Sequence, residues 1–146
     1  LLFDALGIGA GTKVSMVGYI KPTVGSLESM GAQVDVIDEF RQMGDKDRFL
    51  HKLATWADAA LITSTTILNN TLESILDRAG KNVRIALLGP STPMVAEAFG
   101  HRPMVKALAG IVPDRIDPVL KTVRHGLGTR HLHRCSRKVT LRLLQR

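Results

Sequence analysis

Short apolar runs that alternate with amphipathic stretches are the feature that most constrains the fold of this chain. The runs predict strands at residues 14–18, 33–38, 59–62, 83–88 and 105–111, and a weaker alternating pattern predicts a sixth at 139–143. Apolar residues at helical spacing predict helices at residues 22–30, 47–56, 70–79, 93–99 and 115–124. Repeated β–α units with continuous apolar strands are typical of a parallel sheet covered on both faces. We therefore expect an α/β fold, a doubly wound Rossmann-like parallel sheet of five or six strands with helices on both faces.

The charge of the chain is concentrated at one end. The net charge is +7, but residues 1–120 carry 12 Lys or Arg against 13 Asp or Glu, whereas residues 121–146 carry 8 Lys or Arg and no acid. The neutral body argues against a basic nucleic-acid-binding domain. No apolar run approaches the ~20 residues that a membrane-spanning helix needs. The single cysteine excludes an internal disulfide framework, which is typical of a cytoplasmic protein.

The chain has 146 residues, which suits one domain. It begins with Leu1 instead of Met, so we expect a fragment of a longer protein. Residues 1–6 are expected to form the end of a helix, and the glycines at 7, 9 and 11 a flexible segment after it. Residues 1–12 are then the remnant of an upstream domain or a linker. Residues 13–146 are the Rossmann-like domain with its basic carboxy-terminal segment.

The expected site lies at the carboxyl ends of the strands. Open parallel sheets bind ligands there, where the strand order reverses, and in a 2-1-3-4-5 order this point falls between the first and third strands. The loops at residues 18–23, 63–71 and 89–93 are rich in hydroxyls, amides and glycine, and they carry no obvious general base. This composition favours hydrogen bonding to a polar or anionic ligand over acid–base catalysis. Helix capping, by Asn70 and by Thr92 before Pro93, accounts for part of it.

Nucleotide binding has little support in the sequence. The chain lacks G-x-G-x-x-G and the P-loop motif, and Tyr19, Ile20 and Pro22 would obstruct a pyrophosphate in the first loop. Asp38 follows the second strand, where an acid can accept a ribose hydroxyl. A solvated strand-end carboxylate is the simpler interpretation.

A histidine and cysteine cluster lies near the carboxy terminus. His131, His133 and Cys135 would face the same way on an extended strand, and their side chains are good ligands for zinc, copper or nickel. Arginine and lysine residues flank them and would repel a divalent cation. A basic, polar surface segment is therefore the favoured interpretation.

Three segments resemble a known family as a set. They are MVGYIKP at residues 16–22, ALITSTTILNNTLE at 60–73 and LLGPSTPM at 87–94. The family is the prokaryotic "putative heavy-metal chelation" domain of unknown function, and the resemblance covers residues 12–140. It implies a Rossmann-like carboxy-terminal domain preceded by a domain similar to the amino-terminal domain of enolase. The proposed site of that family is the cleft between the two domains.

The resemblance also implies a set of ligand-binding residues. Carried over by motif, they are Gly18, Tyr19, Thr65, Thr66, Asn69, Thr71, Gly89, Ser91 and Thr92. They offer oxygen donors and no thiolate or imidazole, which soft metals prefer. A metal ion, the one cofactor that the family name suggests, would therefore need donors from a ligand molecule or from the absent domain.

Three functions remain open at this point. The first is binding of a small molecule or metal complex, of which heavy-metal chelation is one form. The second is a transferase or lyase that uses the shared cleft, with Tyr19 or Lys21 moving a proton and Thr65 or Ser91 holding an anion. The third is polyanion binding through the basic tail, which lacks aromatic residues for base stacking. The expected macromolecular partner is a second copy of the chain or the missing amino-terminal domain.

Overall fold

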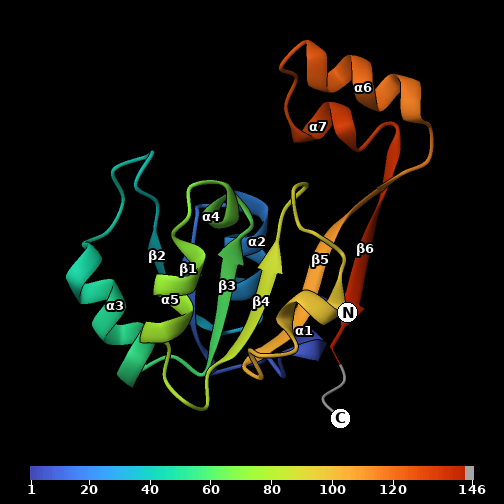
Figure 1. Cartoon of the computed structure of the whole chain (residues 1–146). Coiled ribbons are helices and arrows are strands. Elements are labelled where there is room, and N and C mark those ends of the chain that lie inside the picture. Colours follow the sequence, from blue (N-terminus) through green and yellow to red (C-terminus); the bar gives the residue numbers. More distant parts are fainter. Residues whose placement is uncertain (144–146) are drawn as a thin grey trace.

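A computed structural model, which describes residues 1–143, contains one six-stranded sheet in the order β2-β1-β3-β4-β5-β6 (Figure 1). Its strands are β1 (Lys13–Val17), β2 (Gln33–Ile37), β3 (Ala59–Thr63), β4 (Arg84–Leu88), β5 (Val105–Pro113) and β6 (Ser136–Arg142). The first five pair in parallel, and β6 runs antiparallel to β5. The doubly wound sheet is thus as predicted, and the order reverses between β1 and β3.

Helices cover both faces of this sheet (Figure 1). The helices of the described chain are α1 (Leu2–Ala5), α2 (Lys21–Ser29), α3 (Lys46–Thr55), α4 (Thr65–Leu68), α5 (Leu72–Arg78), α6 (Ile116–Arg124) and α7 (Thr129–Leu132), with a 3-10 turn η1 at Ala96–Phe99. Of these, α6 and α7 lie away from the sheet (Figure 1). Two predicted helix starts are wrong. Asn70 does not cap a helix, because it adopts a left-handed φ of 58° in the turn between α4 and α5. Thr92 does not cap either, because η1 begins only at Ala96.

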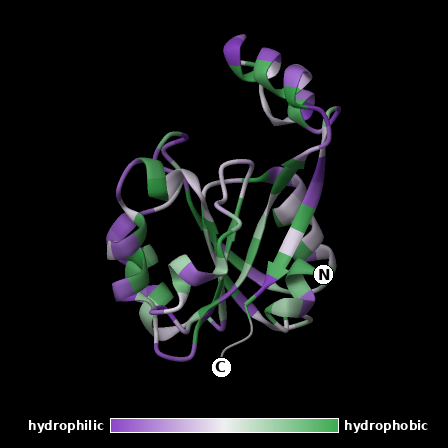
Figure 2. Cartoon of the chain, turned by 45° about the vertical axis from the view of Figure 1, so that its right-hand side comes forward, coloured by the Kyte–Doolittle hydropathy of each residue, from purple (hydrophilic) through white to green (hydrophobic). Residues whose placement is uncertain are grey.

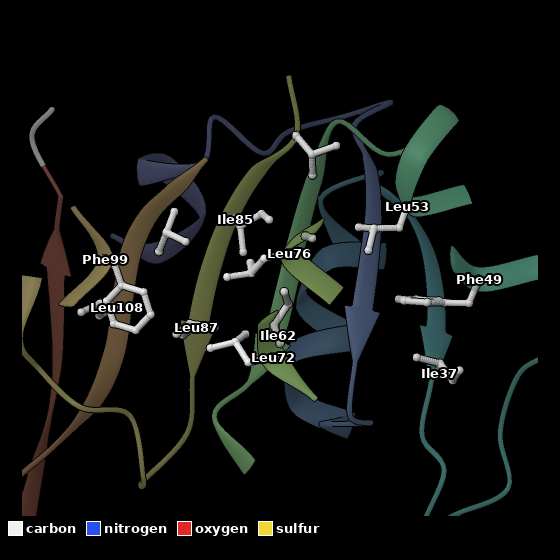
Figure 3. Packing of buried hydrophobic residues seen from close by; sticks show 13 residues of the cluster. Ile37, Phe49, Leu53, Ile62, Leu72, Leu76, Ile85, Leu87, Phe99 and Leu108 are labelled. Carbon is white, nitrogen blue, oxygen red and sulfur yellow. The ribbon is translucent and has the colours of Figure 1, made fainter. Parts of the chain in front are cut away.

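One hydrophobic cluster joins the sheet to α3 and α5. Alternate residues of β3 and β4 point toward this face, where Phe49 and Leu53 of α3 and Leu76 of α5 pack on them (Figure 3). Asp45 caps α3 by accepting a hydrogen bond from the Arg48 amide at 2.7 Å, which fixes the start of the helix at Lys46. This packing places α3 and α5 beside the carboxyl ends of the strands.

A second cluster covers the opposite face. Val14 and Met16 of β1 and Leu61 of β3 pack there against Leu27 of α2. Residues 1–12 contribute Leu6 and Ile8, which are both buried in the same cluster; their expected origin in an upstream domain stays a prediction. Within residues 1–143, no helix has the length and apolar character needed to cross a bilayer.

The chain between β5 and β6 leaves the sheet. Residues 114–135, which we call the arm, carry α6 and α7 beyond the ends of the other strands (Figure 1). The predicted helix at 115–124 therefore exists as α6 but covers neither face of the sheet. The arm and β6 contain most of the predicted basic tail, whose residues 144–146 lie outside the described residues.

Leu61→Ala is expected to lower the free energy of unfolding by about 2–5 kcal/mol, because it removes a fully buried side chain from the central strand. The matched control is Leu1→Ala, since Leu1 is 93% exposed, and its effect should stay within about 0.5 kcal/mol. Denaturant titration of both variants measures the difference. Equal midpoints for the two variants would contradict the central position of Leu61.

Candidate functional site

A cavity of about 330 Å³ lies at the carboxyl ends of β1, β2 and β3. Val17, Ile37 and Thr63 end β1, β2 and β3, and all three line the cavity together with Gly18 and Asp38, which follow the first two strands. Pockets that bind small molecules start at about 300 Å³. The cavity therefore has the position expected from the sheet topology and a volume at the lower end of the usual range.

The cavity wall combines apolar and polar side chains. The apolar side chains come from the strand ends and from α3 and α5: Val17, Ile37, Phe49, Leu50 and Ile75. The polar ones come from the segment after β3 and the start of α5: Thr63, Thr65, Thr66, Asn69, Thr71 and Ser74. A ligand that has both apolar and hydrogen-bonding parts matches this composition.

Gly18 allows the loop after β1 to pass close to β3. Its φ is +87°, and a Cβ built on it would lie 2.8 Å from Cγ2 of Thr63. Any other residue would combine a disfavoured backbone conformation with this clash. The glycine thus fixes the path of the backbone at the cavity edge.

Asp38 ties two loops of the site together. Its Oδ2 accepts a hydrogen bond from the Tyr19 amide at 2.8 Å, and its Oδ1 accepts one from the Arg41 amide at 3.0 Å. The Arg41 guanidinium lies 3.4 Å from the same carboxylate and 5.8 Å from the centroid of the Tyr19 ring. The side chain of Asp38 is 14% exposed, so the expectation of a solvated strand-end acid is wrong.

The threonine-rich segment after β3 forms a hydrogen-bonded turn. The Thr66 hydroxyl donates to the Thr63 carbonyl at 2.8 Å, and the Thr63 and Thr65 hydroxyls lie 3.1 Å apart. The Thr71 hydroxyl donates to Oδ1 of Asn69 at 2.7 Å. These contacts hold the polar wall in place next to the cavity.

The predicted binding residues divide into two groups. The residues that line the cavity are Gly18, Tyr19, Thr65, Thr66, Asn69 and Thr71. Gly89, Ser91 and Thr92 lie outside its lining. Thr92 is buried, and its Oγ1 lies 2.6 Å from Oγ of Ser64 and 2.8 Å from the carbonyl oxygen of Ala109, so it braces β3 against β5. Lys21, the other predicted proton carrier beside Tyr19, does not line the cavity.

Sequence reasoning missed the loop after β2. Glu39, Phe40, Arg41 and Lys46 all line the cavity. The loop folds back through two backbone hydrogen bonds between Asp38 and Met43, both at 3.0 Å. The sequence held no specific signal for this loop, because a single apolar residue in a polar segment is common on protein surfaces.

The histidine and cysteine cluster does not form the extended arrangement that would turn its three side chains the same way. His131 lies in α7 and His133 ends it, so these side chains do not alternate along a strand. The Cys135 thiol is buried, with Sγ 3.4 Å from the carbonyl oxygen of Leu132. Among residues 1–143, no three His, Cys, Asp or Glu side chains group closely enough to hold a metal ion.

The sheet order and the cavity define a doubly wound α/β domain with a pocket at the strand ends. The sequence profile of the DUF364 family, described as "Putative heavy-metal chelation", matches residues 1–142. The chain belongs to this family, as its three sequence motifs indicated.

Two solved structures of this family, both of unknown function, share the fold. The proteins from Pyrococcus horikoshii and Desulfitobacterium hafniense DCB-2 each match with a TM-score of 0.77 and 23% identity, over 90% and 94% of this chain. An uncharacterized protein of Methanocaldococcus jannaschii is 43% identical over 54 residues, which are 36% of this chain and 20% of that protein. The chain spans about half of the two solved proteins, 54% and 55% of their lengths.

Gly18→Ala is expected to destabilise the fold by about 1–3 kcal/mol, because the left-handed φ becomes strained and the new methyl group meets Thr63. Gly25→Ala is the matched control, since Gly25 lies inside α2 with no atom within 4 Å of its would-be Cβ. That variant should be stabilised by about 0.4–1 kcal/mol. Thermal unfolding measures both changes, and equal shifts would contradict the tight approach at Gly18.

Proposed function

We propose that the domain binds a small organic molecule, alone or as a metal complex, in the cavity at the carboxyl ends of β1, β2 and β3. The observation that carries this proposal is the mixed lining, in which Phe49, Leu50 and Ile75 share the cavity wall with hydroxyl and amide groups. An apolar body of the ligand would lie against α3 and α5. Its polar edge would bind the segment that contains Thr65 and Asn69.

The charges of the lining indicate a ligand with little net charge. Asp38 pairs with Arg41 at 3.4 Å, and Glu39 pairs with Lys46 at 3.2 Å. Each carboxylate is thus balanced by a cation of the same loop region. A highly charged anion such as a pyrophosphate would have no net positive field to bind, and Gly18 is not part of a phosphate-binding glycine motif.

The donor set does not fit a bare heavy-metal ion. Soft metals favour thiolate, thioether and imidazole ligands, and the cavity lining contains none of these groups. Its two carboxylates, Asp38 and Glu39, already have cationic partners. A metal would therefore enter as part of a complex whose organic portion supplies the ligands, and the family name is compatible with this form of binding.

A thermal-shift panel tests the proposal. The panel contains Ni²⁺ and Zn²⁺ alone, their citrate complexes, citrate alone, and uncharged nucleosides and aromatic amides. A compound at 100 times its dissociation constant raises the stability of the folded state by about 2.7 kcal/mol, which is a readily measured shift. We expect stabilisation by organic compounds or complexes and none by the free ions. A shift by free ions alone would contradict the proposal, and so would the absence of any shift across the panel.

Thr65→Val is expected to weaken the binding of a stabilising compound from the panel at least tenfold, because the polar wall loses one hydroxyl in contact with the ligand. Ser91→Ala is the matched control, since this predicted binding residue is exposed and lies outside the cavity lining. Isothermal titration measures both affinities. A larger loss for Ser91→Ala would place the ligand outside this cavity.

A further inference from the structure

A second cavity, of about 340 Å³, lies at the amino ends of β4 and β5. This edge of the sheet is opposite to the carboxyl ends, where the first cavity lies (Figure 1). Figure 2 shows hydrophobic strands in the sheet and hydrophilic residues in the connections at its lower edge. The lining of the second cavity contains three cationic side chains, Lys81, Arg84 and Lys106, and no carboxylate. We call it the basic cavity.

The charges of these three cations are not neutralised by the described part of the chain. No carboxylate of residues 1–143 forms an ion pair with any of them. The acids of the neighbouring segments have other partners. Glu73 and Asp77 both bind Arg102, and Oδ2 of Asp58 accepts the Lys13 amide at 2.9 Å. A cavity lined by charges of one sign concentrates ions of the opposite sign, so the basic cavity attracts anions.

The fold holds the Arg84 side chain at the start of β4. Its Nε donates a hydrogen bond to the carbonyl oxygen of Asp58, at 3.4 Å. A Cβ built on Gly7 would lie 2.6 Å from Nη1 of Arg84, so the glycine leaves room for the guanidinium in this position. A guanidinium has five N–H donors, and the bond to Asp58 uses one of them. Because both neighbours are neutral, they orient the guanidinium without cancelling its charge.

An irregularity of β5 places Lys106 at the basic cavity. Ile85 of β4 pairs with Val105 and Ala86 pairs with Ala107, so Lys106 is an extra residue with no partner in β4. A bulge of this kind is rare between parallel strands, and it redirects side chains, often next to functional sites. Lys106 is half-buried, whereas lysine side chains are mostly exposed. The bulge therefore brings a positive charge into a partly enclosed position.

We propose that the basic cavity binds the phosphate group of a small molecule. Phosphate oxygens accept charge-assisted hydrogen bonds from guanidinium and ammonium groups, and both kinds of donor line this cavity. Val83 and Met104 share the lining and would contact the organic part of such a molecule. The volume is at the lower end of the range for small-molecule pockets. This inference is independent of the proposed function, because the two cavities share no lining residue.

Titration of the nitrogen-15-labelled chain with pyrophosphate, followed by amide chemical shifts, tests the proposal. We expect saturable shifts at residues 81–84 and 104–106. The amides of Gly18 and Thr65 should not shift, because the carboxylates and cations that line the first cavity balance each other. The absence of saturable binding would overturn the proposal, and so would shifts centred on the first cavity.

Lys81→Gln and Lys106→Gln should each raise the pyrophosphate dissociation constant by about fivefold or more, because each removes one charged donor. Lys121→Gln is the matched control, since Lys121 is exposed in the basic carboxy-terminal segment and lines neither cavity. Non-specific attraction of anions to that segment would be weakened by the control as well. Equal losses for Lys106→Gln and Lys121→Gln would therefore contradict a specific site. Equal thermal unfolding temperatures verify that all three variants are folded.

An acidic protein segment is the other class of anion that suits a basic cavity. Titration with a short polyglutamate peptide at the same ionic strength tests it in parallel. If the peptide shifts the amides of residues 81–84 and pyrophosphate does not, the cavity is a protein contact and the phosphate proposal is wrong.

The Lys106→Gln variant also separates this proposal from the proposed function. Citrate is an anion, so a citrate-induced thermal shift can arise at either cavity. A shift that Lys106→Gln abolishes belongs to the basic cavity, because this substitution leaves the lining of the first cavity unchanged. A shift that Thr65→Val abolishes belongs to the first cavity. Failure of one proposal therefore leaves the test of the other intact.

Discussion

Burial of both faces of a parallel sheet is the constraint on which the rest of this structure depends. The strands carry apolar residues on both sides, so Ile62 packs toward α3 and α5 while Leu61 packs toward α2. Parallel strands need crossover connections, and these helices provide them. The winding reverses between β1 and β3, and the loops after β1, β2 and β3 then meet at one edge of the sheet. The cavity follows from this topology.

The topology places the loops together, but a few specific contacts shape them into a site. Gly18 lets the backbone after β1 approach Thr63, and Asp38 holds the Tyr19 amide and the Arg41 amide at the same time. These contacts use Asp38, the one carboxylate that the sequence analysis considered for a ribose hydroxyl. A site whose carboxylates are already paired is better suited to hold a ligand than to transfer protons.

The sequence predicted the parts of this molecule that depend on local pattern and sheet topology. It predicted the five parallel strands, the helices that face them, and six residues of the cavity lining. It missed Phe40 and Arg41, because their position depends on a hydrogen bond between Asp38 and Tyr19, 19 residues apart. It left open an extended segment at His131, because residue spacing cannot distinguish a short helix such as α7 from a strand. In both cases the conformation depends on contacts between residues that a local sequence pattern does not include.

The arm is a second case in which a local sequence pattern predicts an element but not its tertiary contacts. The helical spacing of Ile116, Leu120 and Val123 predicts α6, but spacing does not identify the surface that the helix contacts. A parallel strand after β5 would have required α6 to cross the sheet and bury these residues on it. Because β6 instead returns antiparallel to β5, the connection needs no crossover and α6 stands beyond the sheet. Amphipathic helices between strands normally pack their apolar side on the sheet. Because β6 is antiparallel, the apolar side of α6 is exposed instead, at the edge of the sheet that also holds the cavity.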